Sequence, residues 1–526
     1  MPKVLISDKL SDRAVEIFKE RGIEVDFEPG LPAEELLKRI GDYDGLAIRS
    51  ATKVTEEVLN AGAGRLKVVG RAGIGVDNVD LPAATRNGTV VMNTPFGNSI
   101  TTAEHAISMM MALARQIPAA DASTRAGKWE KSKFMGVELF GKTLGLVGAG
   151  NIGCIVADRA QGLKMKVVAF DPFLSPERAK ELGVERVTID ELLARADFIT
   201  VHTPLTDGTR NLLNADAFAK CRKGVRVINC ARGGIVNEAD LKVALESGQV
   251  AGAALDVFEV EPARDNPLFA MDNVVATPHL GAATEEAQEN VALQVAEQMS
   301  DYLLTGAVSN ALNMPSISAE DAPRLQPYMT LACQLGSFAG QVTETAIKAV
   351  TVEFEGHVAK LNVKPLVQAA LAEVMKPFSD AVNMVNAPVF ARERGIEVSE
   401  IVHDRPGDYQ TLIKLTVKTE RFERSVSGTL FGGKLPRLVN IKGISVEAEL
   451  TEHMLYITNH DKPGLIGGLG SVLADAGINI ATFHLGRAEA GGDAIALIAV
   501  DDSVPADVME KLQALPQIMQ VKALNF

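Results

Sequence analysis

The sequence predicts an α/β protein with two doubly wound parallel-sheet units, followed by an α+β segment and a small βαββαβ unit. Three observations lead to this prediction. Short β-branched runs alternate with amphipathic stretches from residue 3 to about 95, a second such series surrounds a glycine fingerprint at 148–153, and residues 453–526 have the order β-α-β-β-α-β. Strands that alternate with helices form parallel sheets covered by helices on both faces.

The first series predicts strands at residues 4–7, 25–27, 46–49, 68–70 and 90–92, with helices at 12–20 and 33–40 between them. One long helix, rich in Ala and Met, is predicted over 101–126. The second series predicts strands at 144–147, 167–170, 198–201, 225–229, 252–256 and 274–276. Chemistry in such paired units usually lies in the cleft between them, at the carboxyl ends of the strands.

The second half of the chain changes character. A helix over 285–304 and a linker over 305–315 precede a segment with strand-like runs at 412–417 and 426–430 around one clear helix at 365–375. In the last segment, strands at 455–458, 478–485, 494–500 and 519–523 and helices at 464–476 and 505–515 give a ferredoxin-like order. The expected domains are residues 1–98 with 285–310, 99–284, 316–450 and 453–526.

Composition excludes several classes of function. A net charge of −14 argues against nucleic acid or an anionic membrane surface as a partner, and no apolar run reaches the length of a membrane span. The first residues enter a strand without a signal-peptide core, and the four cysteines show no paired spacing, which favours a reduced, cytoplasmic protein. The eight histidines show no metal-binding spacing, so no metal is expected.

The run 148–153, Gly-Ala-Gly-Asn-Ile-Gly, follows an apolar stretch and opens a helix-like segment. Asp171 ends the next strand-like run, 23 residues after Gly148. Glycines at these positions allow a tight turn, close approach of a pyrophosphate and close helix–strand packing, and the acid suits the ribose hydroxyls of NAD while repelling the 2′-phosphate of NADP. The alternative is a glycine-rich turn without a ligand.

Oxidation of a 2-hydroxy acid needs a base, a cation for the carboxylate and a group that orients the base. Arg232, Glu261 and His279 follow strands of the second series and supply one group of each kind. Each residue alone is weak evidence, since Glu259 competes with Glu261 and His202 is a rival base.

Residues 70–80, 147–153, 229–236, 254–262 and 278–284 resemble the D-isomer-specific 2-hydroxyacid dehydrogenase family. Residues 49–52 and 93–95, with Asn98, are more specifically similar to the branch that oxidises D-3-phosphoglycerate. This similarity covers residues 3 to about 310, and the following segments resemble the intervening domain of the long form of that branch and an ACT domain.

The resemblance implies an oxidoreductase with a substrate domain and a Rossmann NAD domain. It would convert D-3-phosphoglycerate to 3-phosphohydroxypyruvate, the first step of L-serine biosynthesis. The resemblance makes Arg232, Glu261 and His279 the catalytic residues, with His279 as acid/base. The implied cofactor contacts are Gly148, Gly150, Asn151, Ile152, Gly153, Asp171, Thr203, Cys230, Ala231, Asp256, Gly281 and Ala282, with Asp256 at the nicotinamide carboxamide; the implied substrate contacts are Arg49, Ser50, Arg71, Gly73 and Asn98.

In the ACT-like segment, the resemblance implies an allosteric site for L-serine at Asn459, Asp461, Gly464 and Asn479. The alternative is an ordinary turn followed by an asparagine at the start of a strand. The family also implies a homodimer that is extended to a homotetramer. Two other functions stay open: another 2-hydroxyacid dehydrogenase, such as a glyoxylate or hydroxypyruvate reductase, and a dinucleotide-sensing co-repressor of the same fold.

Overall fold

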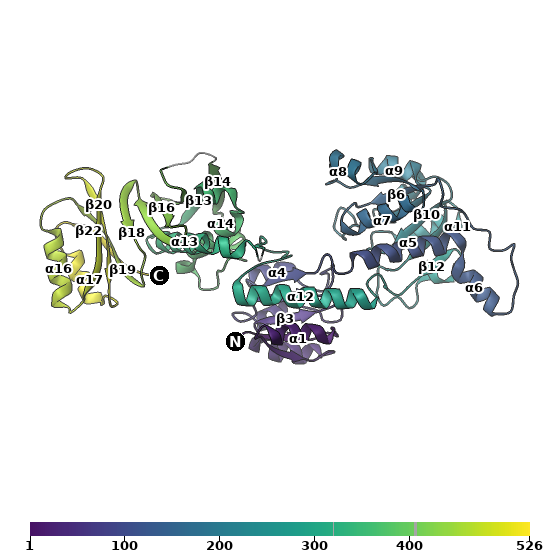
Figure 1. The fold of residues 1–526 in the computed structure, drawn as a ribbon, viewed down its shortest axis with the longest axis horizontal. Helices are drawn as coiled ribbons and strands as arrows, with labels where there is room; N and C mark the ends of the chain where they lie inside the picture. The colour runs from purple at the N-terminus through teal and green to yellow at the C-terminus, as the bar shows by residue number, and fades with distance from the viewer. Residues whose placement is uncertain (319, 404–407) are drawn as a thin grey trace.

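The structure is a computed structural model that describes residues 1–318, 320–403 and 408–526. The molecule is elongated and contains four sheets (Figure 1). The first sheet lies in the middle, the second at one end, and the third and fourth toward the other end. The predicted fold class, two parallel α/β sheets with a ferredoxin-like unit at the end of the chain, is confirmed.

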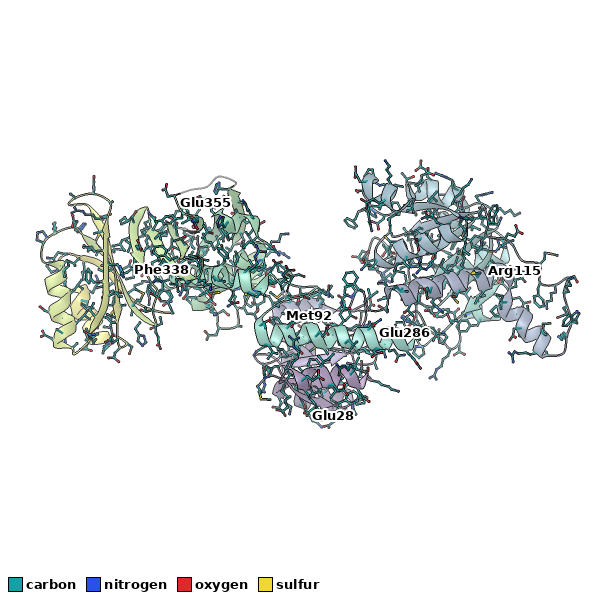
Figure 2. The ribbon with its side chains drawn as sticks, in the orientation of Figure 1. Glu28, Met92, Arg115, Glu286, Phe338 and Glu355 are labelled. Carbon is teal, nitrogen blue, oxygen red and sulfur yellow. The ribbon has the colours of Figure 1, made fainter. Side chains whose placement is uncertain are left out.

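The first sheet has five parallel strands in the order β2-β1-β3-β4-β5. Its elements are β1 (Lys3–Ile6), α1 (Asp12–Glu20), β2 (Glu24–Phe27), α2 (Ala33–Arg39), β3 (Gly45–Ile48), α3 (Glu56–Ala61), β4 (Val68–Arg71), α4 (Leu81–Arg86) and β5 (Val90–Asn93). One face is covered by α12 (Glu285–Thr305), which returns from much later in the chain. Its Val295 and Met299 share a core with Val68 and Met92, the latter labelled in Figure 2.

The single helix predicted over 101–126 is wrong, because the chain forms two helices there. α5 (Ser99–Arg115) ends at Gln116, whose φ of 54° is left-handed, and α6 (Ile117–Arg125) follows. Pro118 explains the break, since proline has no N–H to donate to the carbonyl four residues earlier and its ring clashes with that carbonyl, whereas it is tolerated in the first turn of α6.

The second sheet has seven parallel strands in the order β12-β11-β10-β9-β6-β7-β8. Its elements are β6 (Thr143–Val147), α7 (Asn151–Gly162), β7 (Lys166–Phe170), α8 (Pro176–Glu181), β8 (Glu185–Arg186), α9 (Ile189–Arg195), β9 (Phe198–Val201), α10 (Ala215–Lys220), β10 (Val225–Asn229), α11 (Glu238–Glu246), β11 (Val250–Leu255) and β12 (Val274–Ala276). The strand order reverses between β6 and β9, where ligands of open α/β sheets bind.

The third sheet has six strands in the order β14-β13-β15-β16-β17-β18, of which β13 and β14 are parallel and the other neighbours antiparallel. Its strands are β13 (Ile347–Gly356), β14 (Glu397–His403), β15 (Thr411–Thr419), β16 (Glu423–Phe431), β17 (Leu435–Ile441) and β18 (Ile444–Ala448), and its helices are α13 (Ala322–Gln341), α14 (Lys364–Met375) and α15 (Ala387–Glu393).

The helix predicted at 365–375 is confirmed as α14, but α13 was not predicted, because its sequence contains residues that usually break helices. Pro327 lies inside α13, and Gly336 and Gly340 lie on the face that meets α14. A β-carbon at Gly340 would approach the carbonyl oxygen of Val374 to 2.7 Å, so glycine is what allows these two helices to pack so closely.

The fourth sheet is antiparallel, in the order β20-β21-β19-β22. Its elements are β19 (His453–His460), α16 (Leu465–Asp475), β20 (Ile480–Arg487), β21 (Asp493–Val500), α17 (Ala506–Gln513) and β22 (Ile518–Asn525). Alternate residues of β19 and β21 face opposite sides, so Leu455 and Ile498 pack with α16 and α17. Tyr456 and Leu497 instead join the core beneath the third sheet.

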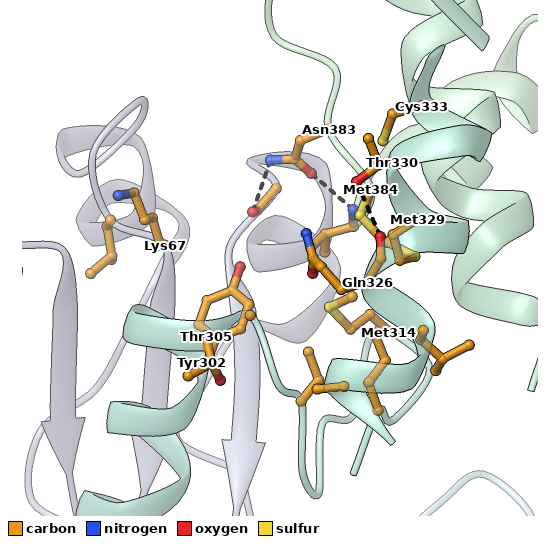
Figure 3. Close-up of a pocket in the computed structure, with 18 of the residues that line it drawn as sticks. Lys67, Tyr302, Thr305, Met314, Gln326, Met329, Thr330, Cys333, Asn383 and Met384 are labelled. Carbon is orange, nitrogen blue, oxygen red and sulfur yellow. Dashed lines mark hydrogen bonds between the residues drawn. The ribbon is translucent and has the colours of Figure 1, made fainter. Parts of the chain in front are cut away.

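A polar contact joins the first sheet to the middle segment. The Asn383 side chain donates to Gly88 O at 3.0 Å and the Asn386 side chain donates to Arg86 O at 3.1 Å. Beside this contact lies a cavity of about 560 Å³ between the end of α12 and α13, lined among others by Tyr302, Gln326 and Met329 (Figure 3). Across the part of the chain that the structure describes, no helix is both long and apolar enough to cross a membrane.

Candidate active site

The glycine fingerprint forms the turn between β6 and α7. Gly148 has a φ of 93°, and a β-carbon there would lie 2.5 Å from His202 O. Gly150 is the N-cap of α7 and has open space beside it, while a β-carbon at Gly153 would overlap Gly148 O. Only glycine fits the first and third positions, and the second leaves room for a ligand at the free N–H groups of the helix.

The remaining predicted cofactor residues surround this turn. The Asp171 carboxylate follows β7 and accepts from Ala149 N and Phe173 N, each at 2.8 Å. The Thr203 hydroxyl is buried and has no hydrogen-bond partner among the described residues. Asn151 and Ile152 begin α7, and Cys230 and Ala231 follow β10. A glycine cradle, an acid at the next strand and an unpartnered hydroxyl fit a dinucleotide.

His279 and Glu261 form a pair at the carboxyl end of the second sheet. His279 Nδ1 lies 2.7 Å from Glu261 Oε2, and Phe258 N donates to Glu261 Oε1 at 3.1 Å. Burial alone would raise the pKa of Glu261, but the hydrogen bonds from His279 and Phe258 N outweigh it and hold that pKa below its ordinary value. The carboxylate therefore stays ionised and orients the imidazole.

The rival residues lie elsewhere. His202 Nε2 contacts Thr200 Oγ1 at 2.8 Å, and burial lowers the pKa of His202 to about 4, so its ring is neutral near pH 7. Glu259 is exposed, and it is Glu261 that contacts the His279 ring.

A cleft of about 830 Å³ opens between the carboxyl ends of the first two sheets. From the first sheet it is lined by Arg49, Ser50, Arg71 and Gly73, and from the second by Glu261, His279 and Ala282, among others. Burial and the positive charges of Arg232 and Arg49 lower the pKa of Arg71 to about 10. The Arg71 guanidinium is thus repelled by two neighbouring guanidinium groups, and a bound anion would relieve that repulsion.

Arg232 also connects the two sheets. Its Nε donates to Asp77 Oδ2 at 2.7 Å, and a β-carbon at Gly75 would overlap its guanidinium. The sequence did not identify Asp77 as a partner, although it lies within the family-like stretch 70–80. Asn98 Oδ1, a predicted substrate contact, is buried with no protein partner in the described ranges.

Asp256, predicted at the nicotinamide, has a fully buried side chain at the end of β11. Its carboxylate accepts from Thr277 Oγ1 at 2.6 Å, Leu280 N at 2.7 Å and Gly281 N at 2.8 Å. Both oxygens therefore hold the turn that carries His279, and the contact with nicotinamide stays a prediction.

Of the four predicted effector residues, Asn459, Asp461 and Gly464 lie at one end of the fourth sheet, whereas Asn479 lies at the opposite end, beside Asp501. Asn459 belongs to β19 rather than to the loop, and its buried side chain donates to His460 O at 3.0 Å. Asp461 Oδ2 accepts from Arg487 at 2.8 Å and from Gly491 N at 2.9 Å. Gly464, with φ 100°, precedes α16, and the Asn479 side chain donates to Asp501 at 2.8 Å.

The described part of the chain holds no group of three or more His, Cys, Asp or Glu side chains arranged for a metal ion. Cys154, Cys221, Cys230 and Cys333 are free thiols.

Comparison with known proteins identifies the family. Residues 107–281 match the D-isomer specific 2-hydroxyacid dehydrogenase, NAD binding domain; residues 324–442 match the D-3-phosphoglycerate dehydrogenase intervening domain; and residues 453–517 match the ACT domain. The D-3-phosphoglycerate dehydrogenase of Bacillus subtilis is 44% identical and that of Methanocaldococcus jannaschii 42% identical, each over 100% of both chains.

Among solved structures, the TT0316 protein from Thermus thermophilus is similar with a TM-score of 0.55 and 36% identity, covering 59% of this chain and 99% of that one. The full-length identity to the two relatives, together with the three domain matches, leads to one conclusion. The chain belongs to the D-3-phosphoglycerate dehydrogenases, within the D-isomer specific 2-hydroxyacid dehydrogenase family.

Proposed function

We infer that this chain catalyses the NAD-dependent oxidation of D-3-phosphoglycerate to 3-phosphohydroxypyruvate, the first step of L-serine biosynthesis. The observation that carries this inference is the cleft itself, where Arg49 and Arg71 face the His279–Glu261 pair. An acid/base and several cations at one cleft suit a substrate with a hydroxyl, a carboxylate and a phosphate.

The chemistry of the side chains follows from their geometry. Because ionised Glu261 accepts from His279 Nδ1, the Nε2 atom is left free to take the proton of the substrate C2 hydroxyl. Arg232 binds the carboxylate and stabilises charge on the forming carbonyl oxygen, and Arg49 and Arg71 bind the phosphate. When bound at the fingerprint, NAD supplies the hydride acceptor.

The test is NADH production from D-3-phosphoglycerate, compared at equal concentrations with D-lactate, D-glycerate and 2-hydroxyglutarate. The expected result is a kcat/KM for D-3-phosphoglycerate at least about tenfold above the others, since two extra cationic contacts favour it. A faster reaction with an unphosphorylated acid would indicate another 2-hydroxyacid dehydrogenase. No turnover with any acid, together with NADH binding, would indicate a dinucleotide-sensing protein.

Cofactor choice is proposed to depend on Asp171. Its carboxylate, already fixed by Ala149 N and Phe173 N, would accept from ribose hydroxyls and repel a 2′-phosphate. Asp171→Ala should narrow the preference for NAD over NADP mainly by raising KM for NAD. Equal use of both cofactors by the wild-type chain would contradict this role.

The ACT domain implies a small-molecule effector, and we propose L-serine as that effector. The Asp461 carboxylate would bind its ammonium group and the first N–H groups of α16 its carboxylate, with Asn479 of a second subunit completing the site. Because the Arg487 guanidinium forms an ion pair with the Asp461 carboxylate, serine must compete with Arg487 for that carboxylate. Asp461→Ala should abolish serine inhibition and leave uninhibited activity intact; absence of serine binding to the wild-type chain at millimolar concentration would refute the proposal.

The domain division, assembly and location are also proposals. Residues 1–98 with 285–310 would bind substrate, 99–284 NAD, and 316–450 and 453–526 would regulate. A homotetramer is expected from the family, and light scattering of the purified chain tests it. The free thiols favour the cytoplasm.

A further inference from the structure

The turn that carries His279 is conformationally strained. His279 has a φ of 57°, a left-handed conformation that is unfavourable for a non-glycine residue. Such a turn persists only where its surroundings hold it. His279 N donates to Asp256 O at 2.9 Å, and the next two amides, of Leu280 and Gly281, donate to the Asp256 carboxylate.

The Asp256 carboxylate in turn depends on α5. His105 Nε2 lies 3.2 Å from Asp256 Oδ1, and its ring is largely covered. A carboxylate with no exposed surface is costly unless its lone pairs are satisfied. Hydrogen bonds from His105 and Thr277 hold the pKa of Asp256 below its ordinary value despite its burial, which keeps it an acceptor for both amides.

A second contact joins the same helix to the same turn. The buried Thr102 hydroxyl lies 2.8 Å from Gly281 O and 3.0 Å from Asn98 O. Thr102 and His105 are three residues apart and therefore project from one face of α5. A β-carbon at Gly281 would lie 3.4 Å from the Thr102 methyl group, so the turn rests directly on this face.

Helix α5 lies at the point where the chain passes from the first sheet to the second. The helix begins at Ser99, where the chain has just crossed from the first sheet to the second. Ser99 Oγ donates to Pro95 O at 2.8 Å, and a β-carbon at Gly97 would press on Val291 of α12. The first turns of α5 thus contact the crossing segment on one side and the His279 turn on the other.

We propose that Thr102 and His105 are positioning residues for the oxidation: from the first turns of α5 they hold the turn 277–281 so that the His279 ring stays aimed into the cleft. Neither residue touches substrate in this role. They act through Gly281 and Asp256, and they tie the placement of the acid/base to the crossing between the two sheets. The proposal rests on the proposed function, because it takes His279 as the acid/base.

The test compares Thr102→Val and His105→Leu with conservative partners. Each variant should lower kcat about tenfold while KM for D-3-phosphoglycerate and for NAD changes less than about threefold, since a displaced base impairs the chemical step more than binding. Thr102→Ser and His105→Gln keep a donor and should recover kcat to within about twofold of wild type. Ser108→Ala is the control, because Ser108 lies exposed on the same helix and bonds only Glu104 O.

Hydrogen exchange supplies a readout that needs no activity. In Thr102→Val and His105→Leu, the amides of Leu280 and Gly281 should exchange at least about tenfold faster, while peptides from β6 and β9 stay unchanged. If kcat is unaltered, or falls equally in the conservative variants, the positioning role is wrong. Unaltered exchange at residues 277–281 would refute the positioning role of Thr102 and His105, whatever the activity of the chain. Failure of the wild-type chain to oxidise D-3-phosphoglycerate would instead refute the proposed function.

Discussion

Two junctions between sheets differ in what they bury. Between the first and second sheets lies a cleft of about 830 Å³, bordered by arginines and by the His279–Glu261 pair. Between the third and fourth sheets the core is continuous and apolar: Phe338 of α13, labelled in Figure 2, packs edge-to-face on Tyr456, with ring centroids 5.4 Å apart. The first junction leaves charged groups that a ligand can pair with, whereas at the second junction apolar side chains pack against one another.

Because the two junctions bury different kinds of side chain, substitutions at them should affect different properties of the protein. Removing a charged group from the cleft should weaken the proposed interaction with substrate while leaving the apolar cores intact. Removing an apolar side chain from the shared core opens a cavity, because interiors are close-packed. Substitutions at the first junction should therefore change kinetics, and those at the second should change the free energy of unfolding.

The largest expected effect is that of His279→Gln. Loss of a proton-transfer group should lower kcat about a hundredfold or more. The His279 side chain is half exposed, so the melting temperature should stay within about 2 °C. His460→Gln, an exposed histidine on β19, is the matched control for uninhibited turnover. Near-normal kcat in His279→Gln would assign the base to another group or to water.

Next is Leu497→Ala in the shared core. This side chain has no exposed surface, and its truncation should lower the free energy of unfolding by about 2–5 kcal/mol, measured by urea titration. Uninhibited kcat should change less than about twofold. Ile466→Ala, on the exposed side of α16, should cost less than about 0.5 kcal/mol. Equal costs for the two variants would show that the junction is not packed as a core.

A smaller change is expected for Arg49→Ala. A charge-assisted hydrogen bond contributes about 1.5–3 kcal/mol, so KM for D-3-phosphoglycerate should rise about tenfold to a hundredfold with little change in kcat. Arg65→Ala is the control, because Arg65 precedes β4 and lines the cavity between α12 and α13, away from the cleft. If KM for unphosphorylated D-glycerate rises equally, Arg49 does not bind the phosphate.

The smallest effect is expected for Asp77, whose carboxylate follows the first sheet and forms an ion pair with Arg232 of the second. Asp77 is exposed, and such ion pairs contribute less than about 1 kcal/mol. Asp77→Asn should free Arg232 for the substrate carboxylate and lower KM about twofold to fivefold. Glu56→Gln, which removes another exposed partner of an arginine, should leave KM unchanged. A higher KM in Asp77→Asn would mean that Asp77 orients Arg232 instead of competing for it.

The fold was predictable where local pattern and packing agree. Buried parallel strands such as 198–201 and 225–229 were predicted with their observed bounds, since apolar runs between turn residues mark them clearly. Where a helix carries proline or glycine for a tertiary reason, the prediction failed. α13 tolerates Pro327 and uses Gly340 to approach α14, and neither fact is visible without the partner helix.

The candidate site divides in the same way. Candidate catalytic residues such as His279 and Glu261 are recognisable from their type and strand-end position, and the structure places their side chains 2.7 Å apart. Thr102, His105 and Asp77 were missed because their partners, Gly281, Asp256 and Arg232, lie more than 150 residues away in the sequence. The sequence signals for them were weak: a threonine and a histidine spaced three apart at the start of a helix, and the place of Asp77 in the family-like stretch 70–80.

The return of α12 to the first sheet has a consequence for synthesis of the chain. A chain that emerges from the ribosome in order completes β5 at Asn93 long before it reaches Val295 and Met299, which cover Val68 and Met92. The whole second sheet, from β6 to β12, is made in the interval. Domains usually fold in the order in which they are made. Here the first sheet to be translated is the later of the two to bury its apolar face completely, because α1 covers only part of that face and the rest waits for α12, which ends at Thr305.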